Sequence, residues 1–197
     1  MKRLLITMLA ASAALPSVAQ AQAIPPAVIA VVDLEKVTSQ CNACKTANAA
    51  LRAQATAQEN REKALAAPLQ TEQQAIQAAA SALNGKEPDA ALQARAKAFD
   101  TKYQQAQEQA ASGRQQLQRN QQYIQKQIGD KLNGVYTQVM QKRGANMLVE
   151  IGQTLASGAA LDVTNDVLVA LNAVLPSVQT IAPAAPARPQ PKQPQGR

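Results

Sequence analysis

The middle of the chain carries apolar residues at helical spacing, and this pattern predicts two long helices. Over residues 45–83 and again over residues 88–142, apolar side chains recur at steps built from three, four and seven. The stripe is interrupted in the first helix, where Gln58, Glu62 and Glu72 fall in the same heptad frame. We therefore expect the two helices to pair as a weak, flexible coiled coil.

A turn between these helices predicts an antiparallel hairpin. Asn84-Gly85 suits a helix end, because glycine adopts the left-handed cap conformation at little cost. Pro88-Asp89 suits the first turn of the next helix. The tip is thus expected near residues 84–89, with arms about 60–75 Å long at about 1.5 Å per residue. Pro68 lies inside the first arm and predicts a kink over residues 64–68.

Short apolar segments on both sides of the hairpin predict a small base. Residues 28–33 (VIAVVD) are rich in β-branched side chains and predict a strand. Residues 145–151 (ANMLVEI) predict another, and a further short strand is expected between or after the turn candidates at 152–153 and 157–158. Thr164 suits the N-cap of a short helix that ends near Val174. Because the first strand has no partner nearby in sequence, strands from the two ends should form one sheet.

The predicted fold class is therefore α+β and mostly α, a long antiparallel helical hairpin on a small β-sheet base. Such a sheet is too small to be stable alone, so self-association through the base is expected. The chain divides into a signal peptide (1–21), a linker with the first strand and helix start (22–44), the hairpin arm (45–143), the rest of the base (144–175) and a Pro-rich tail expected to be disordered (176–197).

The first residues have the layout of a secretory signal peptide. Met1-Lys2-Arg3 is basic, an apolar run of about a dozen residues follows, and Ala19-Gln20-Ala21 offers a cleavage site. An overlapping site ends at Ala23, and an uncleaved anchor is the alternative. The apolar run is short for a membrane span, which needs about 20 residues. We therefore predict an exported and soluble mature chain.

The charge balance indicates anionic partners. The chain has 20 Lys and Arg against 13 Asp and Glu, and its net charge of +7 falls to +5 without Lys2 and Arg3. Acidic polypeptides, anionic lipid headgroups and lipopolysaccharide are suitable partners for an exported basic protein. Nucleic acid is not expected outside the cytoplasm. Aromatic residues make up only 2% of the chain, which favours long helices over a large core.

Cys41 and Cys44 form a Cys-x-x-Cys pair (QCNACK). A c-type haem site needs a histidine after the second cysteine, and a structural zinc site needs four ligands; this chain has no histidine. No metal site and no cofactor are therefore predicted. In an oxidising compartment a local disulfide is the favoured interpretation. Free thiols, or a redox or metal role shared between subunits, are the alternatives.

Two stretches resemble the Skp/OmpH family of periplasmic chaperones. Residues 29–37 (IAVVDLEKV) are similar to that family's opening strand and helix start. Residues 161–168 (LDVTNDVL) are similar to its closing pattern of aspartate, an apolar residue, threonine and a short helix. The resemblance covers roughly residues 28–175. Pro68, the Pro-rich tail and the two cysteines depart from the usual family pattern.

The resemblance implies a homotrimer in which three helical hairpins project from a joined β-sheet body around a cavity. It also implies a periplasmic location and a function without ATP and without catalysis. The expected partners, called clients below, are unfolded outer-membrane proteins, which such a chaperone keeps from aggregating in transit to the outer membrane.

Basic residues on the arm are the candidate client contacts, because unfolded outer-membrane proteins often carry net negative charge. Phe99 and Tyr103, one turn apart, are more consistent with packing against the first helix than with client contact. The candidate basic residues are Arg52, Arg61, Lys63, Lys86, Arg95, Lys97, Lys102, Arg114 and Arg119.

The main alternative is a periplasmic adaptor or spacer whose coiled-coil hairpin docks onto a membrane complex. Such proteins normally flank the hairpin with larger β-domains, whereas only one short predicted strand precedes this hairpin. An enzyme is not expected, because the sequence has no Gly-rich phosphate loop and no Ser/His/Asp or Cys/His set.

Overall fold

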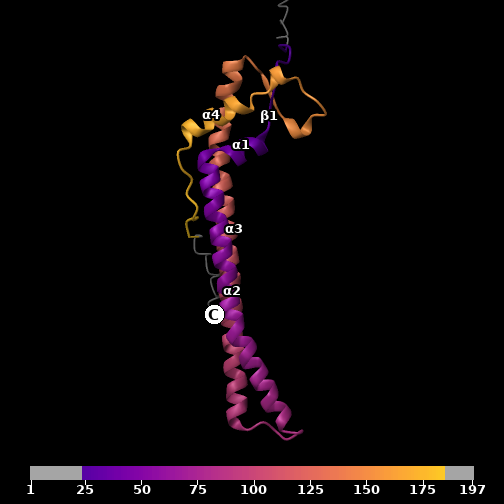
Figure 1. Cartoon of the computed structure of the whole chain (residues 1–197), viewed down its shortest axis with the longest axis vertical. Helices are drawn as coiled ribbons and strands as arrows, with labels where there is room; N and C mark the ends of the chain where they lie inside the picture. Colours follow the sequence, from indigo (N-terminus) through magenta and orange to yellow (C-terminus); the bar gives the residue numbers. More distant parts are fainter. Residues whose placement is uncertain (1–23, 185–197) are drawn as a thin grey trace, which may run out of the picture.

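A long helical hairpin projects from a small base (Figure 1). The structure, a computed structural model, describes residues 24–184. In chain order the elements are β1 (Ile29–Val32), α1 (Leu34–Gln40), α2 (Asn42–Ala82), α3 (Ala90–Arg143), β2 (Met147–Glu150), the 3-10 helices η1 (Ile151–Gln153) and η2 (Ala159–Leu161), and α4 (Thr164–Val174). The predicted fold class is confirmed: the chain is mostly helical with a two-stranded sheet.

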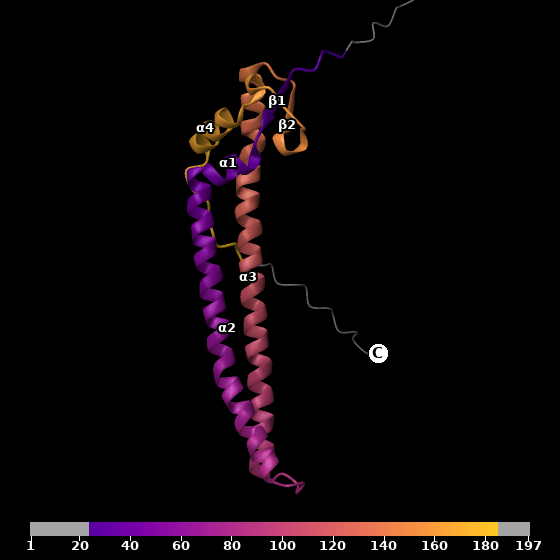
Figure 2. The same ribbon diagram turned by 45° about the vertical axis from the view of Figure 1, so that its right-hand side comes forward.

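Local capping sets the ends of the hairpin helices. Asp89 accepts a hydrogen bond from the Leu92 amide at 2.8 Å and so caps α3. Gly144 ends α3 in the left-handed conformation (φ 66°), and the tip turns at Asn84 and Gly85, which also have positive φ. Helix α2 continues through Pro68 without a break, and Figure 2 shows it bowed along its length.

The core of the molecule lies in the base and the adjoining third of the hairpin. Apolar residues of α3 recur at helical spacing from Ile124 to Val139 and point toward α1, α2 and α4. Val37 of α1 and Val167 and Leu171 of α4 are fully buried against them. This packing fixes the root of the hairpin.

The sheet joins the two ends of the folded region. β1 and β2 are parallel, with Ile29 opposite Met147 and Val32 opposite Glu150, and the whole hairpin forms the connection between them. A further strand was expected between or after the turn candidates at 152–153 and 157–158, and within the described residues no strand follows β2, so this prediction is wrong. That segment instead forms the two 3-10 helices and an exposed loop, and only Asp162 makes a single bridge to Val31. Glycines and turn residues there leave too short an extended run to pair.

Thr164 also differs from its expected role. It is the first residue of α4, and Val163 takes the N-cap position without a side-chain hydrogen bond. The Thr164 hydroxyl instead accepts from the Asp33 amide at 2.9 Å, and the Asp162 carboxylate accepts from the Thr164 amide at 2.8 Å. These contacts join α4 to the start of α1.

The segment after α4 lies extended along the hairpin (Figures 1 and 2). The sequence predicted a tail that is disordered or polyproline-like from residue 176, and residues 176–184 are extended against the hairpin and not disordered. Side chains of α2 and α3 hydrogen-bond to its backbone at Gln179, Thr180 and Ala182. The remainder of the tail, 185–197, and the predicted signal peptide lie outside the described residues.

Candidate binding surface of the hairpin arm

The distal part of the arm has no dry core. Every residue from 59 to 109, all within the described part, is at least partly exposed. Leu65, Leu69 and Ile76 face α3 but are only half-buried. The α3 side chains that are half-buried in this stretch are Leu92, Ala96, Phe99 and Ala106. Two of these four are alanines, which are too small to seal the seam. Apolar surface therefore stays accessible along the two helices.

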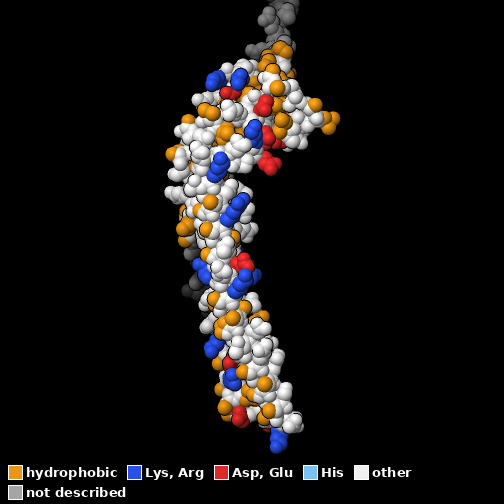
Figure 3. All heavy atoms as spheres, in the orientation of Figure 1, with side chains coloured by type: hydrophobic (Ala, Val, Ile, Leu, Met, Phe, Trp, Pro, Cys, Tyr) orange, Lys and Arg blue, Asp and Glu red, His pale blue; other side chains and the backbone are white. Residues whose placement is uncertain are grey.

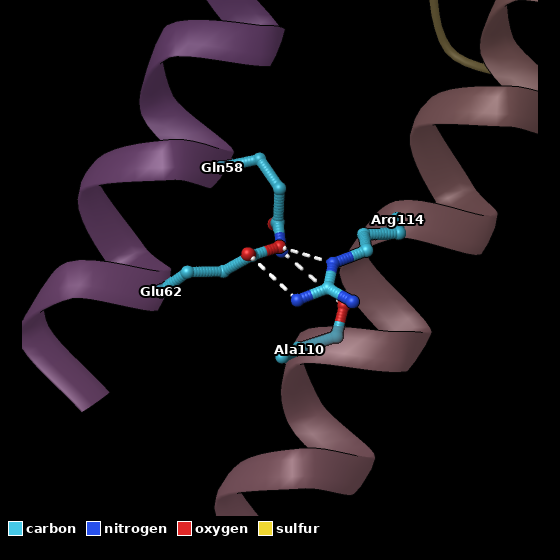
Figure 4. Close-up of polar contacts among 4 residues, drawn as sticks. All are labelled: Gln58, Glu62, Ala110 and Arg114. Atoms are coloured by element: carbon cyan, nitrogen blue, oxygen red, sulfur yellow. Dashed lines mark hydrogen bonds and ion pairs between the residues drawn. The ribbon is translucent and has the colours of Figure 1, made fainter. Parts of the chain in front are cut away.

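Polar side chains bridge the helices where the apolar seam fails. Arg114 of α3 forms a two-pronged ion pair with Glu62 of α2, with both nitrogen–oxygen distances 2.8 Å (Figure 4). The buried amide of Gln58 donates to the Glu62 carboxylate at 3.0 Å and to the Ala110 carbonyl at 3.4 Å. A second such ion pair joins Arg95 and Glu72 nearer the tip. These two interhelical ion pairs, called rungs below, set the register of the two helices.

A glycine makes room for the first rung. A Cβ atom on Gly113 would lie 2.2 Å from Oε1 of Gln58, so a larger residue would displace the Gln58 amide. By contrast, Gly129 has no atom within 4 Å of such a Cβ. Of the three glycines of α3, Gly113 is thus required by a close approach, whereas Gly129 and Gly134 are not.

The ion pairs lower the pKa values of their carboxyl groups. The hydrogen bond from Arg114 is the largest influence on Glu62, followed by the bond from Gln58, and together they lower its pKa from 4.5 to about 2. Arg95 lowers the pKa of Glu72 in the same way. Both carboxylates are therefore ionised through the whole physiological range, and the rungs hold there.

The nine candidate basic residues separate into two groups. Arg95 and Arg114 belong to the interhelical rungs, Lys63 pairs with Glu59 one turn away, and Arg119 is half-buried and donates to Gln116. The other five are exposed and make no ion pair with the described residues: Arg52, Arg61, Lys86, Lys97 and Lys102. The structure does not gather these five into one site but spaces them along the arm.

The arm surface alternates between charge and apolar patches. Figure 3 shows Lys and Arg side chains dispersed along the hairpin, with hydrophobic patches between them toward the tip. Phe99 is half-buried, whereas Tyr103 is 47% exposed, and their rings stack with centroids 6.0 Å apart. An extended polypeptide lying along this face would meet apolar patches and cations in turn.

Two grooves run between the helices in the middle of the arm. The larger, of about 950 Å³, is lined by side-chain amides, Arg61 and Leu65, and Ile181 of the C-terminal segment lies at its edge. The smaller, of about 300 Å³, has Tyr103 and the Glu62–Arg114 rung in its wall. Both grooves are open to solvent and are lined by polar as well as apolar side chains, so they suit an extended polypeptide better than a compact ligand.

Sequence reasoning missed the amide stripe beside the larger groove. Gln116, Asn120, Tyr123 and Gln127 recur at helical spacing on α3, and Gln54 faces them from α2. The signal was present as a repeat of amide side chains at steps of three and four. Polar residues at that spacing usually mark a solvated helix face, so the repeat alone does not predict a binding site.

Cys41 and Cys44 are joined by a disulfide at the junction of α1 and α2. Both are fully buried in the core of the base, and Cys41 Sγ also accepts from the Cys44 amide at 3.1 Å. Within residues 24–184 no group of three or more His, Cys, Asp or Glu is placed to hold a metal ion. The cysteine pair therefore belongs to the folded base and lies away from the arm surface.

This geometry defines a class of protein in which a two-helix arm projects from a small base of helices and a two-stranded sheet. The model of the family described as outer membrane protein (OmpH-like) matches residues 28–171, and the chain belongs to this family. A crystal structure from Caulobacter crescentus CB15, described as an OmpH-like outer membrane chaperone, shares the fold with a TM-score of 0.64 at 18% identity. The match covers 81% of this chain and 94% of the other. Curated protein sequences give no significant match.

The helices of the described region are too polar or too short to cross a bilayer. Even α2 and α3, which are long enough, contain no sufficiently apolar window.

Proposed function

We propose that this protein is a periplasmic, ATP-independent holdase chaperone that binds unfolded outer-membrane proteins and prevents their aggregation in transit. The family membership and the description of the Caulobacter relative support a chaperone role in general. The observation that carries the finer proposal is the distal arm, where no residue between 59 and 109 is fully buried.

An arm of this kind suits a partner that has no fixed shape. An unfolded β-barrel protein exposes apolar segments in many arrangements, so a rigid pocket would fit few of them. The half-buried seam and the two open grooves offer apolar contact that can adapt, and the free cations attract acidic stretches. Because no bond is broken or formed, neither a catalytic residue nor a cofactor is required.

We further propose that the base assembles as a homotrimer. Several apolar side chains of the base are exposed in the single chain, among them Ile29, Met147, Leu155 and Leu161. The two-stranded sheet also leaves strand edges open, and closure with other copies would cover both features. Three arms around one space would enclose a client that one arm can only touch.

Light scattering tests the holdase proposal directly. A urea-unfolded outer-membrane β-barrel protein is diluted into buffer with and without the purified mature protein, at low and high salt. We expect suppressed scattering near one trimer per client, and weaker suppression as salt screens the exposed cations. Scattering that is unchanged at every ratio would contradict the proposal. It would favour the adaptor or spacer, which needs no affinity for unfolded chains.

Matched variants separate the free cations from the structural ones. Replacing Arg52, Arg61 and Lys97 by glutamine removes exposed charges without touching a rung. The control replaces Lys126, Lys131 and Lys142 by glutamine; these exposed residues lie on the base-proximal part of α3, so the control removes the same three charges away from the distal arm. We expect the arm variant to lose salt-sensitive holding and the control to keep most of it. Equal losses would show that only net charge matters. Vesicles of anionic lipid added in competition would report on a lipid or lipopolysaccharide partner.

A further inference from the structure

The C-terminal segment is held on the arm through its main chain. Gln127 binds both backbone groups of Gln179: its Nε2 donates to the Gln179 carbonyl at 2.8 Å, and its Oε1 accepts from the Gln179 amide at 3.0 Å. Gln54 donates to the Thr180 carbonyl at 3.1 Å. Asn120 accepts from the Ala182 amide at 2.9 Å, and Gln116 donates to the Ala182 carbonyl at 3.4 Å.

These contacts are independent of the identity of the bound residues. A side-chain amide carries one acceptor and two donors, so a single Gln can satisfy both the N–H and the C=O of one residue in an extended chain. The bound positions, 179 and 182, are spaced so that their backbone amides meet side chains about two turns apart on α3, Gln127 and Asn120. Of the side chains at positions 179–182, only that of Gln179 forms a hydrogen bond with the arm: its Oε1 accepts from the Tyr123 hydroxyl at 3.2 Å. Any extended polypeptide offers the same main-chain groups.

The described part of the segment, residues 176–184, reaches the base-proximal end of a longer groove. Ile181 lines the larger groove, and beyond it the walls continue toward the tip with further amides, such as Gln58 and Gln109, and with Arg61. The seat is therefore continuous with the surface proposed above for clients. An unfolded chain lying along the arm would need the same amides that now hold residues 179–182.

We propose that the amide stripe of α3 with Gln54 is a main-chain binding site for extended polypeptide, and that residues 179–182 occupy it in cis as an internal competitor of the client. This inference rests on the proposed holdase function. A client gains the base-proximal groove by displacing the segment. The apparent affinity for clients is therefore the intrinsic affinity multiplied by the fraction of molecules in which the groove is free.

The competition makes a quantitative link between two measurements. If the segment is seated about nine-tenths of the time, about a tenth of the molecules are competent, and removing the segment should tighten client binding about tenfold. The same seating protects the Gln179 and Ala182 amides from hydrogen exchange, while the Thr180 and Ile181 amides make no backbone or side-chain hydrogen bond within residues 24–184. The factor by which exchange of the Gln179 and Ala182 amides is slowed should therefore be about as large as the fold-gain in client affinity on truncation.

The experiment compares three forms of the mature protein. One is the full chain, one ends at Val178, and the control ends at Ala184, which keeps every described contact of the segment. Amide exchange by NMR is measured on the full chain with and without a urea-unfolded outer-membrane β-barrel protein, and client affinity is measured for all three. Gln127→Ala removes the seat without shortening the chain, and Gln122→Ala, exposed on the same helix, is its matched control.

We expect protection at 179 and 182 that is lost when client is added, and tighter client binding in the Val178 form but not in the Ala184 form. Gln127→Ala removes an amide that the segment and the client share, so it should lose the protection at 179 without the gain in affinity that truncation gives, and Gln122→Ala should change neither. Client binding that leaves the protection intact, or equal affinities in all forms, would overturn the inference while the holdase function stands. A free protein without protection at these amides would overturn it too. Absence of client binding in every form would instead contradict the proposed function, and the competitor role with it.

Discussion

Gly113 offers a sharp test of the interhelical rung, because it is the glycine over which the Gln58 amide packs. In the interior of a helix, Gly→Ala ordinarily stabilises by about 1 kcal/mol. At Gly129, where a new Cβ would meet no atom within 4 Å, that gain should be realised in full. At Gly113 the same Cβ would lie 2.2 Å from Oε1 and 2.3 Å from Nε2 of Gln58, so the amide must leave its place.

The displaced amide decides the sign of the effect. Gln58 is only 7% exposed, and it would lose both its bond to the Ala110 carbonyl and its bond to the Glu62 carboxylate. Leaving a nearly buried polar group without partners costs about 1–3 kcal/mol. Set against the helix gain, Gly113→Ala should destabilise by about 1 kcal/mol. The two substitutions should therefore differ by about 2 kcal/mol in the free energy of unfolding.

Urea unfolding followed by circular dichroism measures this difference, at one protein concentration because self-association adds to apparent stability. The double variant Gln58→Ala with Gly113→Ala removes the collision, so the loss caused by Gly113→Ala should shrink or reverse in that background. The reasoning fails if Gly113→Ala stabilises as much as Gly129→Ala. It fails equally if the Gln58→Ala background leaves the cost of Gly113→Ala unchanged.

Three further outcomes follow from the same structure. Because the folded pKa of Glu62 is depressed, the stabilisation by its ion pair with Arg114 is fully present above pH 4.5 and is lost as the pH falls toward about 2. Thermal melts should therefore show a lower melting temperature at pH 2.5 than at pH 5, and Glu62→Gln should reduce that difference in melting temperature. Reducing the Cys41–Cys44 disulfide should lower the free energy of unfolding by at most about 2 kcal/mol, since the closed loop is very short; a loss above about 4 kcal/mol in urea would contradict this. Arg95→Met should loosen the tip half of the arm, seen as faster amide exchange near Glu72, whereas Lys97→Met should leave exchange there unchanged.

The hairpin could be predicted from sequence because its information is local. Helical spacing and the Asn84-Gly85 stop act within a few residues, and they define two helices and a tip. Pro88-Asp89 marked the start of the second helix, although both residues were expected in its first turn, whereas Asp89 is its N-cap and the helix begins at Ala90. The pairing of β1 with β2, though not its parallel orientation, followed from one physical requirement, that an isolated apolar strand needs a partner. The further strand failed because a short run between turn residues carries too little pattern to separate a strand from a 3-10 turn.

The contacts that shape the arm surface join residues far apart in the sequence, so they could not be predicted from local sequence patterns. Glu62 was interpreted as a break in the apolar seam, yet its partner Arg114 lies 52 residues away, and the pairing depends on the register of two weakly packed helices. The seat of the C-terminal segment has the same origin. A Pro- and Ala-rich tail predicts disorder by composition, but amides of two helices supply the partners that the tail itself lacks.

The central claim, that clients lie along the distal arm, is tested most directly by site-specific photo-crosslinking. A photoreactive side chain is placed at Gln73, exposed in the smaller groove, or at Val169, which is 62% exposed on α4 of the base. Each variant is irradiated with a urea-unfolded outer-membrane β-barrel protein freshly diluted from denaturant. The account predicts strong crosslinks from position 73 and weak ones from position 169. Crosslinks that form at 169 and not at 73 would contradict it.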